Sequence, residues 1–242
     1  MKNNFRSIII SLSVVIAAWI LGSAWKSSHS SNHTISVTGL ASKDFDSDLI
    51  VWSGSVIRKS LELKDAYAEI KKDQETIKKY LIAKGILESE MVFNSINISK
   101  DFNVIYNNDG SRRETFNGFV LSQQVEINSK NVEKVEKISR EVTEIIDQGI
   151  EFNSNVPSYY YTKLDKLKLE MLANATANAK QRAEKIAENA GAELGKLKKA
   201  DMGIFQITAQ NSPEELTWGG AFNTYSKNKT ARITVKTDYF VN

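Results

Sequence analysis

Residues 49–85, LIVWSGSVIRKSLELKDAYAEIKKDQETIKKYLIAKG, decide the fold because the spacing of their hydrophobic residues changes once. Over residues 50–56 apolar and polar residues alternate, which is the period of a half-buried β-strand. Further on, apolar residues recur every three to four positions, with Ser60 as a helix N-cap and Gly85 just past the end. A strand followed by one amphipathic helix over residues 61–84 is therefore predicted.

The same change of period recurs along the chain. The other expected elements are a strand at 35–39, a long hairpin of strands around 92–104 and 119–127 with a turn at 107–110, a helix at 131–148, a short strand near 150–152, a helix at 163–190, and strands at 202–209 and 231–241. Two β-α-β-β units, 48–128 and 150–241, are visible in this order. We expect an α+β fold whose antiparallel sheets pack against helices.

The N-terminal part predicts a membrane segment. Residues 7–25 contain no charge, and as a helix they would span about 28 Å, close to the thickness of the hydrocarbon layer. Lys2 and Arg6 precede the run and Lys26 alone follows it, so the positive-inside rule places residues 1–6 in the cytoplasm. The residues expected to contact lipid are Ile8, Ile9, Ile10, Val14, Val15, Ile16, Trp19, Ile20, Leu21 and Trp25.

Two fates of this segment follow from the residues. An uncleaved signal anchor would leave a single-pass protein of the inner membrane, with its C-terminal domain on the periplasmic side. Cleavage at the small residues Gly22, Ser23 and Ala24 would instead release a soluble periplasmic protein. The length of the run and the tryptophan at its boundary favour the anchor.

The exported part divides into a tether and a domain. Residues 26–34 are rich in serine and predict a flexible tether, and residues 35–242 form the expected α+β domain. Beyond residue 25 there are 30 basic residues against 29 acidic ones, interleaved along the helices. This balance predicts a solvated surface and no nucleic-acid partner.

The composition provides little for catalysis. The chain has no Cys, and its two His, His29 and His33, lie in the serine-rich tether. Disulfides, zinc-thiolate sites and thiol nucleophiles are excluded, and a histidine dyad in the folded part is excluded as well. Asp44, Asp46 and Asp48 alternate, but the glycine and distal glutamate of a calcium loop are missing. We therefore expect no cofactor, no metal and no enzymatic activity.

Small and aromatic residues mark candidate interfaces between copies of the chain. The buried stripe of the third helix changes from leucine to alanine, and small side chains permit close backbone approach. Aromatic groups outside the periodic elements are enriched at interfaces, although they can also fold back over a sheet edge. The candidate interface residues are Tyr159, Tyr160, Tyr161, Ala175, Ala179, Ala183, Trp218 and Phe222.

Two stretches carry a family resemblance. The opening ISVTG of 35–39, followed by an acidic turn and a tryptophan-containing strand, and the alanine-rich AKQRAEKIAENAGAELGK of 179–196 resemble the SIMPL-domain family of bacterial envelope proteins, which includes the periplasmic immunogenic proteins. The resemblance implies an exported α+β protein without established catalytic activity. It also implies links to envelope or oxidative stress, and assembly of at least one relative into a large ring-like oligomer. Ser47 stands where many relatives carry proline.

Two functions of different classes follow. The first is a membrane-anchored envelope protein that self-associates as a homo-oligomer and acts as a scaffold or interaction module. The second is a periplasmic small-ligand-binding protein or a carboxylate-dependent hydrolase, since paired carboxylates perform acid-base chemistry when burial separates their pKa values. No spacing in the sequence singles out such a pair, so the scaffold is the leading hypothesis.

Overall fold

The computed structural model describes residues 13, 15–22, 33–106, 110–213, 217 and 219–241. The chain divides into two compact units that each combine distant stretches of sequence. Unit 1 comprises Met1–Leu40, Asn174–Gly203 and Thr234–Asn242, and unit 2 comprises Ala41–Ala173 and Ile204–Ile233. The sheets are antiparallel and pack against helices, so the predicted α+β class is confirmed.

Unit 2 is built on an antiparallel sheet. Among the described residues its strand order is β3-β5-β2-β6, with β4 added to β5 and β7 added to β2. The bounds are β2 Leu49–Ser60, β3 Met91–Phe93, β4 Asn97–Tyr106, β5 Arg112–Ser129, β6 Phe152–Ser154 and β7 Ser158–Tyr160. The central strand β2 alternates buried and half-buried residues, as its sequence predicts.

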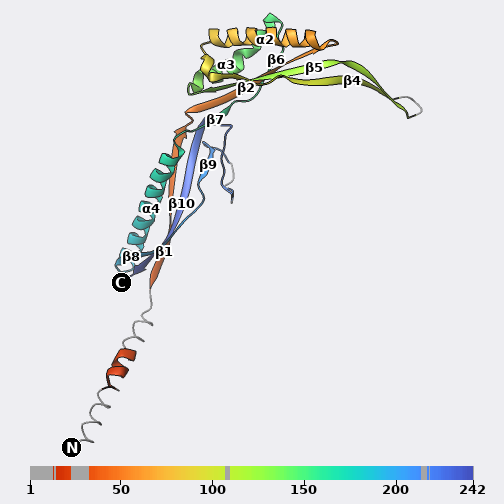
Figure 1. Cartoon of the computed structure of the whole chain (residues 1–242). Helices are drawn as coiled ribbons and strands as arrows, with labels where there is room; N and C mark the ends of the chain where they lie inside the picture. Colours follow the sequence, from red (N-terminus) through yellow and green to blue (C-terminus); the bar gives the residue numbers. More distant parts are fainter. Residues whose placement is uncertain are drawn as a thin grey trace, which may run out of the picture. The chain divides into compact units, whose positions relative to one another are not determined.

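Helices cover the apolar face of this sheet (Figure 1). Helix α2, Leu63–Ala83, places Ile70, Ile77 and Leu81 against Trp52 of β2, and all four side chains are almost fully buried. Helix α3, Val132–Glu141, begins at Asn131, whose side chain accepts a hydrogen bond from the Lys134 amide as predicted.

Two helix predictions need correction in detail. The stretch 131–148 is α-helical only to Glu141, and Val142–Gln148 continue as a 3₁₀ helix before Gly149 ends it with a φ of 77°. Final turns commonly tighten in this way. Helix α2 begins at Leu63 rather than at residue 61, and Ser60 does not cap it, since the Ser60 hydroxyl accepts a hydrogen bond from the Glu62 amide before the helix starts.

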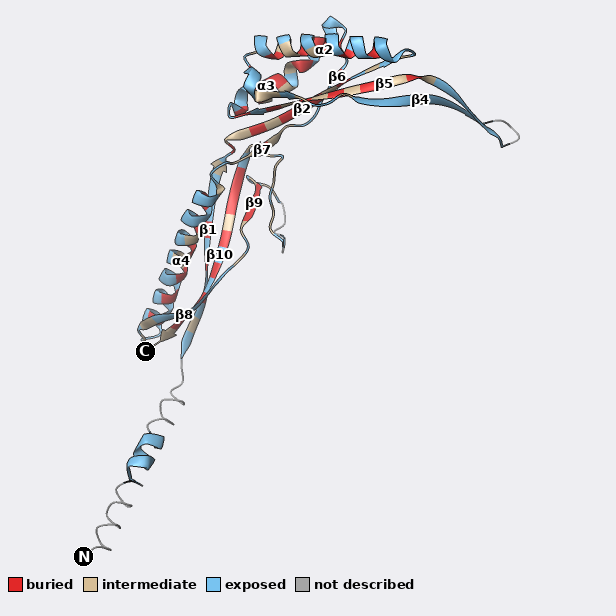
Figure 2. Ribbon diagram, viewed as in Figure 1, coloured by how far each residue is buried: buried red, intermediate tan, exposed pale blue. Residues whose placement is uncertain are grey.

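Unit 1 packs the second half of a long helix on a second antiparallel sheet. Its strands follow the order β1-β10-β8. The elements are β1 Thr34–Asp46, α4 Leu164–Asn189, β8 Leu194–Met202 and β10 Asn228–Val241. All of β8 belongs to unit 1, whereas β1, α4 and β10 contribute only residues 34–40, 174–189 and 234–241 to it. A small core joins Val37 and Tyr239 to Ala179 and Ala183 of the helix. Figure 2 shows buried residues along α4 and β10. In unit 2, β9, Gln206–Ala209, pairs with residues 229–232 of β10.

The sheet connections depart from the predicted pair of β-α-β-β units. Strands β6 and β7 lie in the predicted β-α-β-β unit 150–241, but they pair with β2, which lies in the predicted unit 48–128. The backbone of Tyr159 in β7 lies opposite Ile50 in β2. Strand β8 was not predicted, because as an exposed edge strand it shows no alternation of apolar and polar residues. The expected single strand 202–209 is the end of β8 followed by β9, with a break at residues 203–205.

Most of the predicted membrane segment lies outside the described residues, including Ile8, Ile9, Ile10, Val14 and Trp25. Residues 15–22 are helical, and Val15, Ile16, Trp19, Ile20 and Leu21 are exposed. The described part of the chain contains no helix with the length and apolar character needed to cross a membrane.

Candidate protein–protein interface

The hairpin of β4 and β5 extends beyond the rest of the unit 2 sheet (Figure 1). Strand β5 pairs with β2 only from Phe119 onward, because β2 ends at Ser60. Strand β4 continues to pair with β5 out to residue 112. The part of the hairpin formed by residues 101–106 and 112–118 is therefore a two-stranded ribbon in the described structure. We call this ribbon the arm.

A three-strand contact fixes the base of the arm. Asp101 of β4 accepts hydrogen bonds from the Lys59 ammonium of β2 and, at 2.7 Å, from the side-chain amide of Asn117 in β5. The bond from Lys59 is the main cause that lowers the pKa of Asp101, and Asn117 adds to it. Asn117 is the extra residue of a β-bulge, since Asp101 pairs with Gly118 and the next residue pairs with Phe116.

Gly118 permits this junction for two reasons. Its φ of 117° is a conformation that residues with a side chain rarely adopt, and an added Cβ would lie 2.7 Å from the Ser60 carbonyl oxygen. The bulge therefore forms where β2 ends and the arm begins. Bulges of this kind bend a strand and increase its twist, which sets the direction of the arm.

One face of the arm is apolar and continues the core of unit 2. Phe119 packs against that core, its ring lies 5.2 Å from the Phe116 ring, and Phe116 lies 5.9 Å from Phe102, both pairs in edge-on geometry. The two rings farther from the core are partly exposed to solvent: Phe102 is 44% exposed and Phe116 is 42% exposed. Exposed Ile98 and Val104 share the Phe102 side of β4 by alternation.

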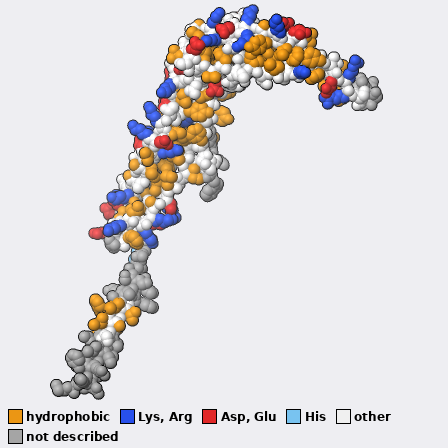
Figure 3. All heavy atoms as spheres, viewed as in Figure 1, with side chains coloured by type: hydrophobic (Ala, Val, Ile, Leu, Met, Phe, Trp, Pro, Cys, Tyr) orange, Lys and Arg blue, Asp and Glu red, His pale blue; other side chains and the backbone are white. Residues whose placement is uncertain are grey.

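The outer edge of β4 is also open. Among the described residues, β5 is the only strand that pairs with β4, and nine of the ten residues of β4 are exposed. Figure 3 shows hydrophobic side chains along this hairpin and charged ones toward its outer end. Arg112 and Glu114 form an ion pair in this part of β5. An isolated two-stranded ribbon is marginally stable in water, and an unpaired strand edge is a template for another strand. The arm thus has the properties of an association surface.

The predicted tyrosine cluster is mainly internal. Tyr159 is 7% exposed, belongs to the core of unit 2 and donates its amide proton to the Thr224 carbonyl at 2.7 Å. Burial is the main cause that raises its pKa. Tyr160 and Tyr161 are half-buried, and the Tyr161 ring packs 4.8 Å from Phe45. These residues fold over the sheet edge of their own chain.

The structure likewise places the predicted alanine stripe inside the molecule. Ala175, Ala179 and Ala183 have no exposed surface, because Gly39 of β1 lies against the first two and Ala183 belongs to the small core that contains Val37. Their small side chains serve close packing within one chain, so they are not free to contact another. Phe222 is 52% exposed and pairs through its backbone with Ile207, while Trp218 lies outside the described residues.

The part of the chain that the structure describes contains one buried carboxylate and no metal-ligating cluster. No cluster of three or more His, Asp or Glu residues could hold a metal there. The one buried carboxylate among the described residues is Asp73, which is 5% exposed and forms an ion pair with Arg58. The three alternating aspartates bond to protein donors: Asp44 to Thr230 and Gln210, Asp46 to Asn228, and Asp48 to Thr162.

The sequence predicts the hairpin but not the exposure of its aromatic face. The signal that could have revealed the exposure is a mismatch of strand lengths. The strand at 50–56 and its helix are too short to cover both strands of a hairpin that extends across residues 92–127. The aromatic residues of the hairpin that lie beyond that cover must then be solvated or contact another molecule.

Comparison with known proteins gives one family. The family model described as "SIMPL: Protein of unknown function (DUF541)" matches residues 35–237, which is most of the chain. The match begins where the sequence places the start of the folded domain. No curated protein matches the chain.

Proposed function

The chain belongs to the SIMPL family over residues 35–237, and on this premise we propose that it is a membrane-anchored, exported envelope protein that self-associates through its arm and acts as a scaffold rather than an enzyme. The observation that carries the proposal is the aromatic face of the arm. Phe102 and Phe116 extend the core of unit 2 into solvent beside an open strand edge.

A second copy is the occupant that this surface suits best. The apolar face and the open edge lie on the same strand, so antiparallel pairing of two arms would satisfy the backbone groups of β4 and bring their aromatic rings together. Because such a contact uses the same surface on both copies, it produces a closed dimer, and further contacts could extend it.

The anchoring part of the proposal rests on residues 7–25. Their uncharged length matches a bilayer, and the flanking Lys2 and Arg6 favour a cytoplasmic N-terminus. Residues 26–34 then link the membrane to the domain on the periplasmic side. The rival hydrolase hypothesis needs two buried carboxylates in one concave site, and in the described structure Asp73 alone is buried and is already paired.

Two measurements test the proposal separately. Sedimentation of the full chain in a neutral detergent over a wide concentration range should show species larger than a monomer, and a monomer at every concentration would refute self-association. N-terminal sequencing of the protein from the membrane fraction should begin at Met1 or Lys2. A sequence that begins near Trp25 would instead show a released periplasmic protein.

A further inference from the structure

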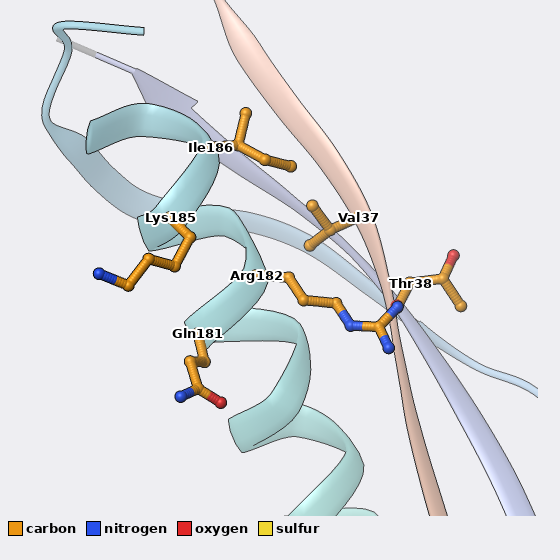
Figure 4. A pocket seen from close by; sticks show the side chains of 6 residues that line it. All are labelled: Val37, Thr38, Gln181, Arg182, Lys185 and Ile186. Atoms are coloured by element: carbon orange, nitrogen blue, oxygen red, sulfur yellow. The ribbon is translucent and has the colours of Figure 1, made fainter. Parts of the chain in front are cut away.

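Unit 1 contains an open cavity of about 440 Å³ between α4 and β1, within the size range of small-ligand sites. Figure 4 shows its lining. Two residues come from β1 and four from successive turns of α4, and the complete lining is Val37, Thr38, Gln181, Arg182, Lys185 and Ile186.

The cavity carries a positive charge that the protein does not neutralise. Arg182 reaches across to β1, where one nitrogen of its guanidinium donates to the Thr38 carbonyl oxygen at 3.0 Å (Figure 4). This bond orients the guanidinium but leaves its charge in place, since no ion pair joins Arg182 to a carboxylate among the described residues. Lys185, by contrast, pairs with Glu188 at 2.8 Å. Arg182 is thus a positioned cation whose other guanidinium N–H groups can donate to a ligand.

Apolar side chains lie beside that cation. Val37 of β1 is 8% exposed, and Ile186, one turn after Arg182 on α4, is 49% exposed. A free phosphate would use the guanidinium and gain nothing from Val37 and Ile186. A ligand that combines an anionic head with a hydrocarbon portion would use both, because arginine binds phosphate oxygens in bidentate fashion and the apolar wall shields alkyl groups from water.

The cavity is close in sequence to the predicted anchor. Eight residues, 26–33, separate the apolar run from β1, and even a fully extended chain of that length spans only about 28 Å. This step rests on the proposed function, since it requires the anchor to remain. We propose that the cavity binds the phosphodiester headgroup of an anionic membrane phospholipid, with Arg182 on the phosphate and Val37 and Ile186 against the start of the acyl chains.

Native mass spectrometry of the full chain, released from neutral detergent, tests the proposal. Phosphatidylglycerol and phosphatidylcholine with identical acyl chains are added together in equal amounts, and glycerol phosphate is added alone. The wild-type chain should bind about ten times as much phosphatidylglycerol as phosphatidylcholine. Arg182→Gln should abolish the preference, whereas Lys180→Gln, the same charge change on the same helix outside the cavity, should retain it.

A hydrophobic variant checks the other half of the site. Ile186→Ser should lower phosphatidylglycerol binding, and Ile146→Ser, the same change at another exposed isoleucine in unit 2, should not. Equal lipid preference in Arg182→Gln and Lys180→Gln would overturn the proposal, as would glycerol phosphate binding as tightly as the lipid. The same spectra report subunit number and the N-terminal mass, so loss of self-association or of the anchor would be seen independently of lipid selectivity.

Discussion

Gly39 of β1 lies so close to Ala179 of α4 that a Cβ at Gly39 would come within 2.8 Å of the Ala179 Cβ and still closer to the Ala175 carbonyl oxygen. The backbone of the strand therefore packs directly against the backbone of the helix at this point in unit 1. Neither the glycine of the VTG motif nor the alanine stripe can be explained alone, because each leaves the space that the other occupies.

Replacing Gly39 with alanine is expected to destabilise unit 1 by about 3 kcal/mol, since the new methyl group meets backbone atoms that cannot move without shifting the helix. Hydrogen-deuterium exchange should show faster exchange in residues 174–189 while α2 of unit 2 stays protected. Gly219→Ala is the matched control, because among the described residues beyond its two chain neighbours no atom lies within 4 Å of the place that its methyl group would occupy. Unchanged exchange in Gly39→Ala would show that the close approach is not required.

The double variant Phe102→Ser/Phe116→Ser should weaken self-association by at least about tenfold, because two aromatic side chains no longer leave water on contact. Sedimentation of the full chain in neutral detergent measures the change. Tyr225→Ser removes a more exposed ring, 76% accessible, elsewhere in unit 2 and should have no effect. If both variants assemble like the wild type, the arm is not the interface.

Acid should loosen the base of the arm. The pKa of Asp101 lies below its ordinary value of 3.8 because Lys59 and Asn117 donate to the carboxylate. A lowered pKa means that the contact contributes fully above that ordinary value and is lost as the pH falls through the lowered one. An NMR titration of the Asp101 carboxyl carbon should give a midpoint below 3.8, and Lys59→Met should raise it. A wild-type midpoint at or above 3.8 would contradict the contact.

The ion pair between Arg58 and Asp73 should be costly to break. Arg58 donates to both Asp73 oxygens and, at 2.9 Å, to the Gly149 carbonyl, so it ties β2 to α2 and to the end of the 3₁₀ helix. Asp73→Asn is expected to destabilise unit 2 by about 3 kcal/mol, because the largely covered guanidinium loses its counter-charge. Amide exchange in α2 measures the loss.

Two further variants test whether the loss of stability is specific to the ion pair between Arg58 and Asp73. Glu75→Gln changes an exposed carboxylate on the same helix and should have little effect. Arg58→Met/Asp73→Leu, which replaces the pair with apolar groups, should recover much of the lost stability. A stability loss in Glu75→Gln as large as that in Asp73→Asn would show that the effect is not specific to the ion pair.

Local sequence patterns were sufficient to predict the elements that bury one face in a core. The alternation in β2 and the helical spacing that ends at Leu81 each reflect a core on one side, and Gly149 ends its helix where predicted. Strand β8 gave no such signal, since it lies at a sheet edge and seven of its nine residues are exposed. Its lysines are the kind of residue that protects an edge from unwanted pairing.

The candidate interface was harder to predict for a different reason. A stripe of small residues such as Ala175, Ala179 and Ala183 indicates that something packs closely against the helix, but the pattern is the same whether the partner is another chain or β1. The aromatic face of β4 has the opposite property. It looks like an ordinary core face, and the pairing of β5 with β2, which stops at Phe119, shows that its outer part is uncovered.

The pairing of β1 with β10 has a consequence for the order of events during biosynthesis. The carbonyl oxygen of His33, just before β1, accepts a hydrogen bond from the amide of Val241, so β1 pairs with residues that are synthesised some two hundred positions later. If the N-terminus is held at the bilayer while the chain is threaded outward, β1 must wait there as an unpaired strand.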